Sequence, residues 1–147
     1  MQLISRRDAI VIAALIISGG PRNVFAAPID AEAEIAKFTY GESPRAGRIT
    51  IDLPEIAENG NSVPLAIAVD SPMTARDHVS DVLVLADRNP RPVVAQFHFT
   101  AMAGRAQAAT RIRIASTQTI IVLARTSIGA LFMDQKPVKV TIGGCGG

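Results

Sequence analysis

Between residues 49 and 142, hydrophobic and polar positions alternate with a period of two in a series of short runs. Residues 49–53 show the pattern most simply, since three aliphatic side chains are separated by Thr50 and Asp52. This period is typical of a β-strand with one buried and one solvated face. The strands predicted in this way are 49–53, 63–69, 82–86, 93–100, 109–115, 119–125, 130–133 and 138–142. Short strands with turn residues between them predict an all-β, immunoglobulin-like antiparallel β-sandwich.

Two of these segments indicate which strand is central and which residues face the core. Residues 63–69 are apolar at nearly every position, which favours a central strand. Along the fifth predicted strand, the alternation directs Ile112 and Ile114 inward and Arg111 and Arg113 outward. The sandwich therefore has a predicted core and a predicted basic surface on the same strand.

The segment that precedes the strands has a helical pattern. Asp30 is placed to cap a helix, Ile35 and Phe38 lie three residues apart, and Gly41 is a typical helix stop. A short helix over residues 30–38 is therefore predicted at the start of the folded domain.

Residues 1–26 are organised like an export signal. Arg6 and Arg7 form a short basic start, residues 9–18 carry no charge, and small or modest side chains follow at 24–26. The uncharged segment is too short to cross a bilayer, which takes about 20 residues. A buried N-terminal helix of the domain is the alternative interpretation.

From this leader we predict cleavage after Ala26, a single carrier domain over residues 27–142, and a short arm over 143–147. The twin arginine predicts export in the folded state, with or without a partner protein, and a periplasmic location. Removal of the leader takes away three of the 15 basic and one of the 13 acidic residues, so the remainder is neutral. A neutral chain without a basic run does not favour nucleic-acid binding, and no membrane partner is expected.

The C-terminus contains the most unusual feature of the sequence. Cys145 is the single cysteine of the chain, and Gly143, Gly144, Gly146 and Gly147 surround it. Glycine permits backbone angles that other residues avoid, so the sequence predicts a flexible arm with little bulk. The five residues would extend roughly 17 Å at about 3.4 Å each, far enough to enter the active site of another protein.

A lone cysteine in an oxidising compartment is either an intermolecular disulfide partner or a free thiol with a function. A free cysteine has a pKa of about 8.5, so a small fraction is thiolate at neutral pH. A mobile glycine arm does not hold a base beside the thiol, which favours a covalent carrier over a catalyst. A tail without a role and a disulfide that joins two chains remain alternatives at this point.

Other candidate residues are less informative. His78 and His98 lie far apart and lack metal-ligand spacing, so no metal site is predicted. Three arginines, Arg111, Arg113 and Arg125, are predicted to share one sheet face, where they would either steer anions or simply be solvated. No set of serine, histidine and acid is visible in the sequence, although folding could assemble one.

Several motifs resemble those of the SoxY family of bacterial thiosulfate oxidation. The end of the chain, residues 138–147 (VKVTIGGCGG), is similar to the family signature. The resemblance continues upstream in residues 49–60 (ITIDLPEIAENG), 63–65 (VPL), 89–92 (NPRP) and 110–113 (TRIR). Residues 71–79 depart from the family pattern, which leaves the details of partner binding open.

The resemblance implies a non-catalytic carrier that binds sulfur intermediates covalently at Cys145, with no other cofactor. It implies a tight heterodimer with a SoxZ subunit that is exported together with the chain. Three partner enzymes are implied: a cytochrome c-type enzyme that conjugates thiosulfate, a manganese-dependent hydrolase that releases sulfate, and, in some organisms, a molybdenum sulfur dehydrogenase. A sheet face rich in valine and isoleucine is expected to bind SoxZ.

Two other function classes compete with the carrier. One is a structural or adhesive exported sandwich that dimerises through a Cys145 disulfide. The other is a carrier that holds sulfur as a thiocarboxylate on Gly147, which a Cys145→Ser change would leave intact.

Overall fold

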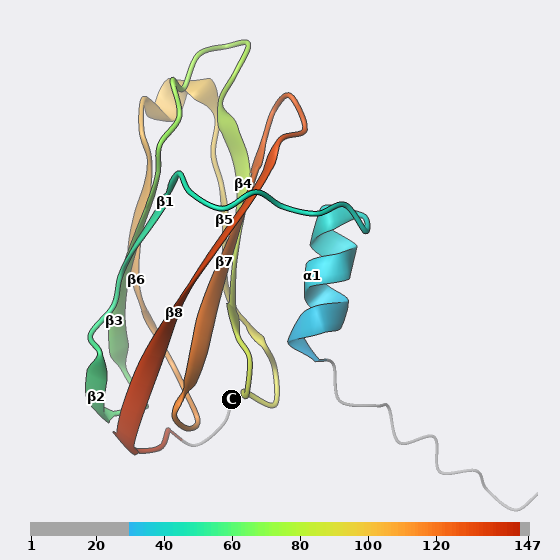
Figure 1. Ribbon diagram of the computed structural model, residues 1–147. Coiled ribbons are helices and arrows are strands. Elements are labelled where there is room, and N and C mark those ends of the chain that lie inside the picture. Colours follow the sequence, from blue (N-terminus) through green and yellow to red (C-terminus); the bar gives the residue numbers. More distant parts are fainter. Residues whose placement is uncertain (1–29, 145–147) are drawn as a thin grey trace, which may run out of the picture.

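The computed structural model describes residues 30–144, which form two packed β-sheets with one helix against the outside (Figure 1). One sheet has three strands in the order β1-β3-β6, and the other has five in the order β2-β8-β7-β4-β5. The elements are α1 (Ala31–Thr39), β1 (Ile49–Asp52), β2 (Ile56–Asn59), β3 (Val63–Val69), β4 (Val79–Ala86), β5 (Val93–His98), the 3-10 helix η1 (Ala101–Ala103), β6 (Ala106–Ile112), β7 (Gln118–Thr126) and β8 (Leu131–Ile142). The predicted β-sandwich with a short N-terminal helix is confirmed.

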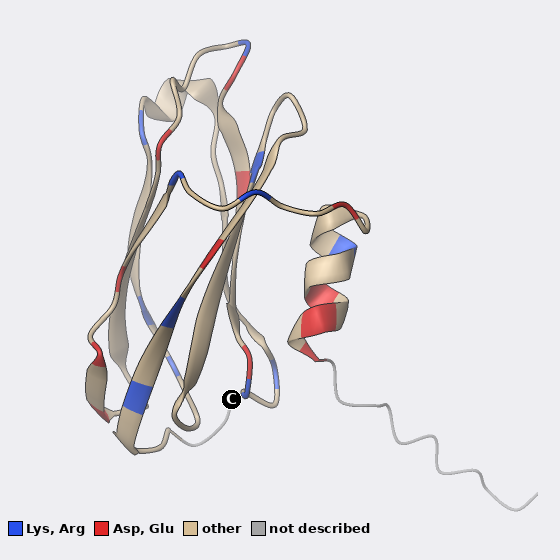
Figure 2. Cartoon of the chain, in the orientation of Figure 1, with Lys and Arg blue, Asp and Glu red and all other residues tan. Residues whose placement is uncertain are grey.

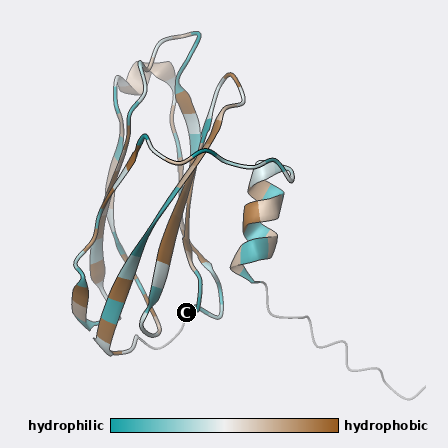
Figure 3. Ribbon diagram, in the orientation of Figure 1, coloured by the Kyte–Doolittle hydropathy of each residue, from teal (hydrophilic) through white to brown (hydrophobic). Residues whose placement is uncertain are grey.

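The alternating apolar and polar residues of the sequence lie on opposite faces of each sheet. Apolar and polar bands succeed one another along the strands, most visibly along β8 (Figure 3). The inward residues of both sheets form the main core, and those of β3, β4 and β7 include Val63, Leu65, Val82, Val84 and Ile120. All five are at most 2% exposed, so the space between the sheets is closed to water.

The central strand of the three-stranded sheet is the one that the sequence predicts. β3 pairs antiparallel with β1 and with β6, in a register that runs from Val63 opposite Ile112 to Val69 opposite Ala106. Ile112 and Ile114 are buried, whereas Arg111 and Arg113 are exposed, as the alternation predicts.

Two features of the five-stranded sheet differ from the prediction. β2 pairs in parallel with β8, with Ile56 opposite Lys139, so the sandwich is not purely antiparallel. The sequence pattern does not predict this strand, because only Ala57 of its four residues is buried. β8 is one continuous strand instead of two, and Pro137 lies within it. The pairing with β2 begins only at Lys139, so Pro137 lies where β8 has a free edge that tolerates a missing N–H.

The N-terminal helix begins and ends as the sequence indicates. The Asp30 carboxylate accepts a 2.7 Å hydrogen bond from the backbone N–H of Ala33. At the other end Tyr40 adopts left-handed angles, and the Gly41 N–H donates to the carbonyl of Ala36. No helix within residues 30–144 is both long and apolar enough to cross a bilayer.

The helix covers the outer face of the five-stranded sheet (Figure 1). A second, smaller core lies there, formed by Ala31 and Phe38 of the helix and by Leu85, Leu123 and Leu131 of three strands. This face of the sheet is therefore buried on the outside as well, which explains why β4 is apolar at most positions.

Candidate functional site

The structure describes only the beginning of the predicted carrier arm. Gly143 and Gly144 follow directly on β8, whereas Cys145, Gly146 and Gly147 lie outside the described residues. The predicted export signal with Arg6 and Arg7 also lies outside them. The candidate site therefore consists of Gly143, Gly144 and the residues that surround them.

Backbone hydrogen bonds hold this start of the arm against the end of the sandwich. The Gly60 N–H donates to the Ile142 carbonyl at 2.8 Å, and the Ile114 N–H donates to the Gly60 carbonyl at 2.8 Å. The Gly144 N–H then donates to the Ile114 carbonyl at 3.0 Å. We call Gly60, Ile114, Ala115, Gly143 and Gly144 the glycine junction, because three distant segments of the chain meet there.

The junction leaves no room for side chains at its three glycines. A Cβ on Gly60 would lie 2.2 Å from the Ile114 oxygen and 2.7 Å from the Gly144 nitrogen. A Cβ on Gly143 would lie 2.2 Å from the Ala115 oxygen, and one on Gly144 would lie 2.8 Å from the Gly60 oxygen. Real Cβ atoms do not approach backbone so closely, so glycine is required here for close packing.

This packing assigns Gly143 and Gly144 a role that the sequence does not reveal. The sequence predicts a flexible arm that starts at Gly143, but Gly144 is buried and hydrogen-bonded in the structure. Gly60 is a site residue that sequence reasoning missed, because Asn59 and Asn61 on either side make the segment look like an ordinary turn. Its proximity to the arm depends on folding alone.

A polar contact network supports the junction from the loop between β4 and β5. The Asn89 side-chain amide donates to the Arg113 carbonyl at 2.8 Å, and its oxygen accepts from the Ala115 N–H at 2.9 Å. The same oxygen accepts from Gln118, which is 4% exposed. The loop is thereby attached to the strand end that contacts the arm.

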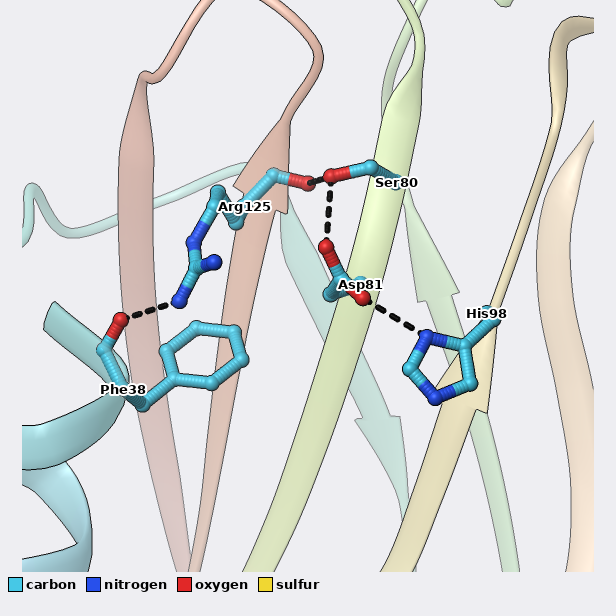
Figure 4. Close-up of polar contacts among 5 residues, drawn as sticks. All are labelled: Phe38, Ser80, Asp81, His98 and Arg125. Carbon is cyan, nitrogen blue, oxygen red and sulfur yellow. Dashed lines mark hydrogen bonds and ion pairs between the residues drawn. The ribbon is translucent and has the colours of Figure 1, made fainter.

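The three arginines that were predicted to share a face do not do so. Arg111 and Arg113 belong to β6 and the residues after it, whereas Arg125 lies on β7 in the other sheet. The Arg125 guanidinium stacks on the rings of Phe38 and Tyr40, at 4.5 and 4.9 Å, and donates to the Phe38 carbonyl (Figure 4). Arg125 therefore attaches the helix to the sheet and is not available to a ligand.

Near Arg125, folding brings a serine, an acid and a histidine together (Figure 4). His98 Nδ1 lies 2.7 Å from an Asp81 oxygen, and the Ser80 hydroxyl donates to the other Asp81 oxygen at 2.8 Å. Ser80 is thus bonded to the acid and to the Arg125 carbonyl, and no bond joins it to the histidine. A nucleophile must contact its base, so this group does not have the geometry of a hydrolase triad.

The remaining candidates contribute no metal site. His78 lies in the loop before β4, where its ring is 3.1 Å from the Thr74 carbonyl. Among residues 30–144, no group of three histidine, cysteine or acidic side chains is arranged to hold a metal ion.

Comparisons with known proteins identify a family for this chain. The family described as sulfur oxidation protein SoxY matches residues 35–145, a range that includes the junction and Cys145. The solved structure of the sulfur carrier protein SoxY from Chlorobium limicola f thiosulfatophilum is 30% identical, with a TM-score of 0.62, and covers 77% of this chain and 97% of its own. No curated protein sequence matches the chain.

More distant structures share the fold alone. A superoxide reductase (neelaredoxin) from Ignicoccus hospitalis is 14% identical with a TM-score of 0.57 over 74% of this chain and 90% of its own. A putative superoxide reductase from Thermotoga maritima is 20% identical with a TM-score of 0.54 over 70% of this chain and 89% of its own. Such a likeness shows a shared sandwich and says nothing of the chemistry. The family match extends over most of the chain and is more specific: this chain belongs to the SoxY family of sulfur oxidation proteins.

Proposed function

We propose that the chain is a covalent carrier that binds sulfur-oxidation intermediates at Cys145 and presents them to partner enzymes. The observation that carries this proposal is the glycine junction, which holds the chain at Gly144 immediately before the thiol-bearing residue. A carrier needs a fixed point from which a reactive group extends, and Gly144 supplies that point. Cys145, Gly146 and Gly147 are then the part of the arm that enters an enzyme.

The chemistry at Cys145 consists of an oxidative and a hydrolytic step. In the first, the thiol sulfur forms a bond to the outer sulfur of thiosulfate, and the pair loses one proton and two electrons to a cytochrome c-type enzyme. In the second, water attacks the sulfonate sulfur of the resulting thiosulfonate, a manganese-dependent hydrolase releases sulfate, and a persulfide remains on Cys145. A molybdenum sulfur dehydrogenase is the expected oxidant of that persulfide where the organism has one.

The chain itself is proposed to be a substrate and not a catalyst. The set of Ser80, Asp81 and His98 lacks the contact between nucleophile and base. Activation of the thiol is therefore assigned to the enzyme that receives the arm.

The proposal includes a cellular location and a partner protein. A SoxZ subunit is expected to form a heterodimer with the chain, and the twin arginine at Arg6 and Arg7 is expected to direct the folded pair to the periplasm. Both expectations follow from the family and from the leader, which precedes the described residues.

Intact mass measurement tests the carrier role directly. The exported protein is purified from thiosulfate-grown cells that contain the partner enzymes, and its mass is compared before and after reduction. We expect reducible additions of one or two sulfur atoms, or of a thiosulfate group, which the Cys145→Ser variant lacks.

Three other results would contradict a carrier that is loaded at Cys145. A free thiol alone, in the presence of the partner enzymes, would show that nothing is loaded at Cys145. A homodimer of twice the mass that reduction separates would support the structural sandwich joined by a Cys145 disulfide. Loading that persists in the Cys145→Ser variant would instead indicate Gly147 as the carrier position.

A further inference from the structure

A basic cleft lies beside the glycine junction, between the start of β5 and the end of β6. Its volume is about 350 Å³, and its lining includes the apolar residues Ile112, Val93 and Val94. Arg91, Arg111 and Arg113 line it together with Asn61 and Asn89. We call this feature the arginine cleft.

The charge of the arginine cleft is uncompensated. None of its lining residues is acidic, and the ion pairs found within residues 30–144 involve neither Arg91 nor Arg113. Asp87, which lies in the same loop as Arg91, accepts instead from the Thr119 N–H at 2.9 Å. Two guanidinium groups therefore face solvent at the cleft with their hydrogen-bond donors available to an anion.

The arginines are held by rigid or bonded neighbours. Arg111 donates from one Nη to the carbonyl and to the hydroxyl of Ser62, at 3.2 and 3.1 Å. Arg91 lies between Pro90 and Pro92, whose rings restrict the backbone on both sides. The Asn89 bonds to the backbone of Arg113 and Ala115 fix this loop to the segment that follows β6, so the backbone of the cleft keeps its shape without a ligand.

The arginine cleft and the arm share their supporting segments. Asn61 of the cleft follows Gly60 of the junction, and Arg113 precedes Ile114, whose carbonyl binds the Gly144 N–H. Figure 2 shows the basic residues at the end of β6 and in the β4–β5 loop at the same end of the sandwich. Cys145 is the next residue after Gly144, and consecutive Cα atoms are only about 3.8 Å apart.

From this placement we propose that the arginine cleft binds the sulfonate end of a thiosulfonate carried on Cys145. This inference rests on the proposed function, because it assumes that Cys145 is loaded. Guanidinium groups donate parallel hydrogen bonds to oxyanions, and a sulfonate offers three oxygens that share a negative charge. The persulfide left after sulfate release has no oxygens, so the cleft distinguishes the arm before and after that step.

The test uses chemical loading, so it does not depend on any pathway enzyme. The Cys145 thiolate of the full chain attacks a central sulfur of tetrathionate, which forms the protein thiosulfonate and releases thiosulfate. Loading should shift the backbone amide NMR signals of Arg91, Ile112 and Arg113, and the Cys145→Ser variant treated in the same way should show no shift.

A kinetic measurement gives a second readout. 2-Mercaptoethanol attacks the Cys145 sulfur, forms a mixed disulfide and releases thiosulfate. The rate of this release should rise about tenfold in the R91Q/R113Q variant, because the sulfonate is no longer held in the cleft. Loss of positive charge by itself slows attack by an anionic thiolate, so charge removal alone predicts the opposite change. The matched control is R76Q/R105Q, which removes the same charge at the far end of the sandwich and should leave the rate unchanged.

The outcomes separate this inference from the proposed function. Unchanged amide signals at the cleft, or equal displacement rates in both double variants, would overturn docking, even where cells still yield loaded Cys145. Absence of adducts in thiosulfate-grown cells would overturn the carrier function, whatever the chemically loaded protein does. Thermal unfolding of each variant shows that the comparison is made between folded proteins.

Discussion

Gly60 is important for the start of the arm because it has no side chain. Its missing Cβ lets three backbone segments meet at hydrogen-bonding distance, where any other residue would contact the Ile114 oxygen and the Gly144 nitrogen. The same holds for Gly143 against Ala115. At the residue scale, the arm therefore depends on glycine for close approach at its base.

A Gly60→Ala substitution should displace the arm. The new methyl group must move Gly144 away from the Ile114 carbonyl, so we expect faster hydrogen exchange of the Gly144 amide and a loss of unfolding free energy of about 1–3 kcal/mol. Hydrogen exchange measured by NMR, together with thermal unfolding, checks both effects.

Gly129→Ala is the matched control for this change. Gly129 has positive φ and nothing within 4 Å of its virtual Cβ, so its substitution costs backbone strain without touching the arm. If Gly144 exchange accelerated equally in both variants, the junction would not be what holds the arm.

At the element scale, β8 is paired along its length with two different strands in turn, and α1 is attached to the sheet through Arg125. β7 pairs with residues 131–138 of β8 along one edge, and the parallel β2 pairs with residues 139–142 along the other, with Asn59 opposite Ile142. The strand is therefore held firmly until the arm begins. The helix, in contrast, makes contact through the smaller core and through the stack of Arg125 on Phe38 and Tyr40.

Replacement of Arg125 by methionine should loosen the helix. Methionine retains an unbranched apolar side chain but removes the cation–π contacts and the hydrogen bond to the Phe38 carbonyl. We expect a destabilisation of about 1–3 kcal/mol, with faster hydrogen exchange in α1 than in β3.

The exposed Arg105→Met variant is the comparison for this prediction. It removes an equal charge from the loop before β6 and should alter neither helix exchange nor stability by more than about 0.5 kcal/mol. Unchanged exchange in α1 of Arg125→Met would mean that apolar packing alone retains the helix.

At the scale of the whole molecule, most valine and isoleucine side chains of residues 30–144 are buried. They fill the space between the sheets, and α1 covers the outer face of the larger sheet. The outer face of the smaller sheet has small or polar residues instead, among them Thr50, Ala66, Ala68 and Gln107 around a shallow cleft. Ile56 and Ile142 are nevertheless exposed, on the paired strands β2 and β8. The valine- and isoleucine-rich surface expected for SoxZ stays a prediction.

Co-purification tests the proposed heterodimer. When the tagged chain is produced together with the SoxZ of the same organism, we expect a stable 1:1 complex in size-exclusion chromatography, and the Cys145→Ser variant should retain it. The reason is that a pair exported in the folded state needs a durable noncovalent interface. A chain that elutes as a monomer beside free SoxZ would contradict the partner assignment.

The amino-acid sequence alone was sufficient for the features that depend on local pattern. Alternation between residues 49 and 53 predicted a strand with one buried face, and Asp30 predicted the helix cap, because both depend on neighbours within a few residues. The terminal motif around Cys145 was enough to indicate the family that the comparisons show. The proposed chemistry requires only the thiol of Cys145, and the sequence by itself shows that this thiol is present.

Only the tertiary structure decided which distant residues meet. Gly60, Ile114 and Gly144 lie in three separate parts of the sequence, and their contact follows from the pairing of β2 with β8 and from the end of β6. Arg125 and Arg113 look alike in the sequence, but Arg125 lies on β7 and Arg113 follows β6 of the other sheet, so one attaches a helix and the other lines a cleft. Side-chain periodicity determines which face a residue occupies along its own strand, whereas strand order and backbone proximity arise from the packing of the whole chain.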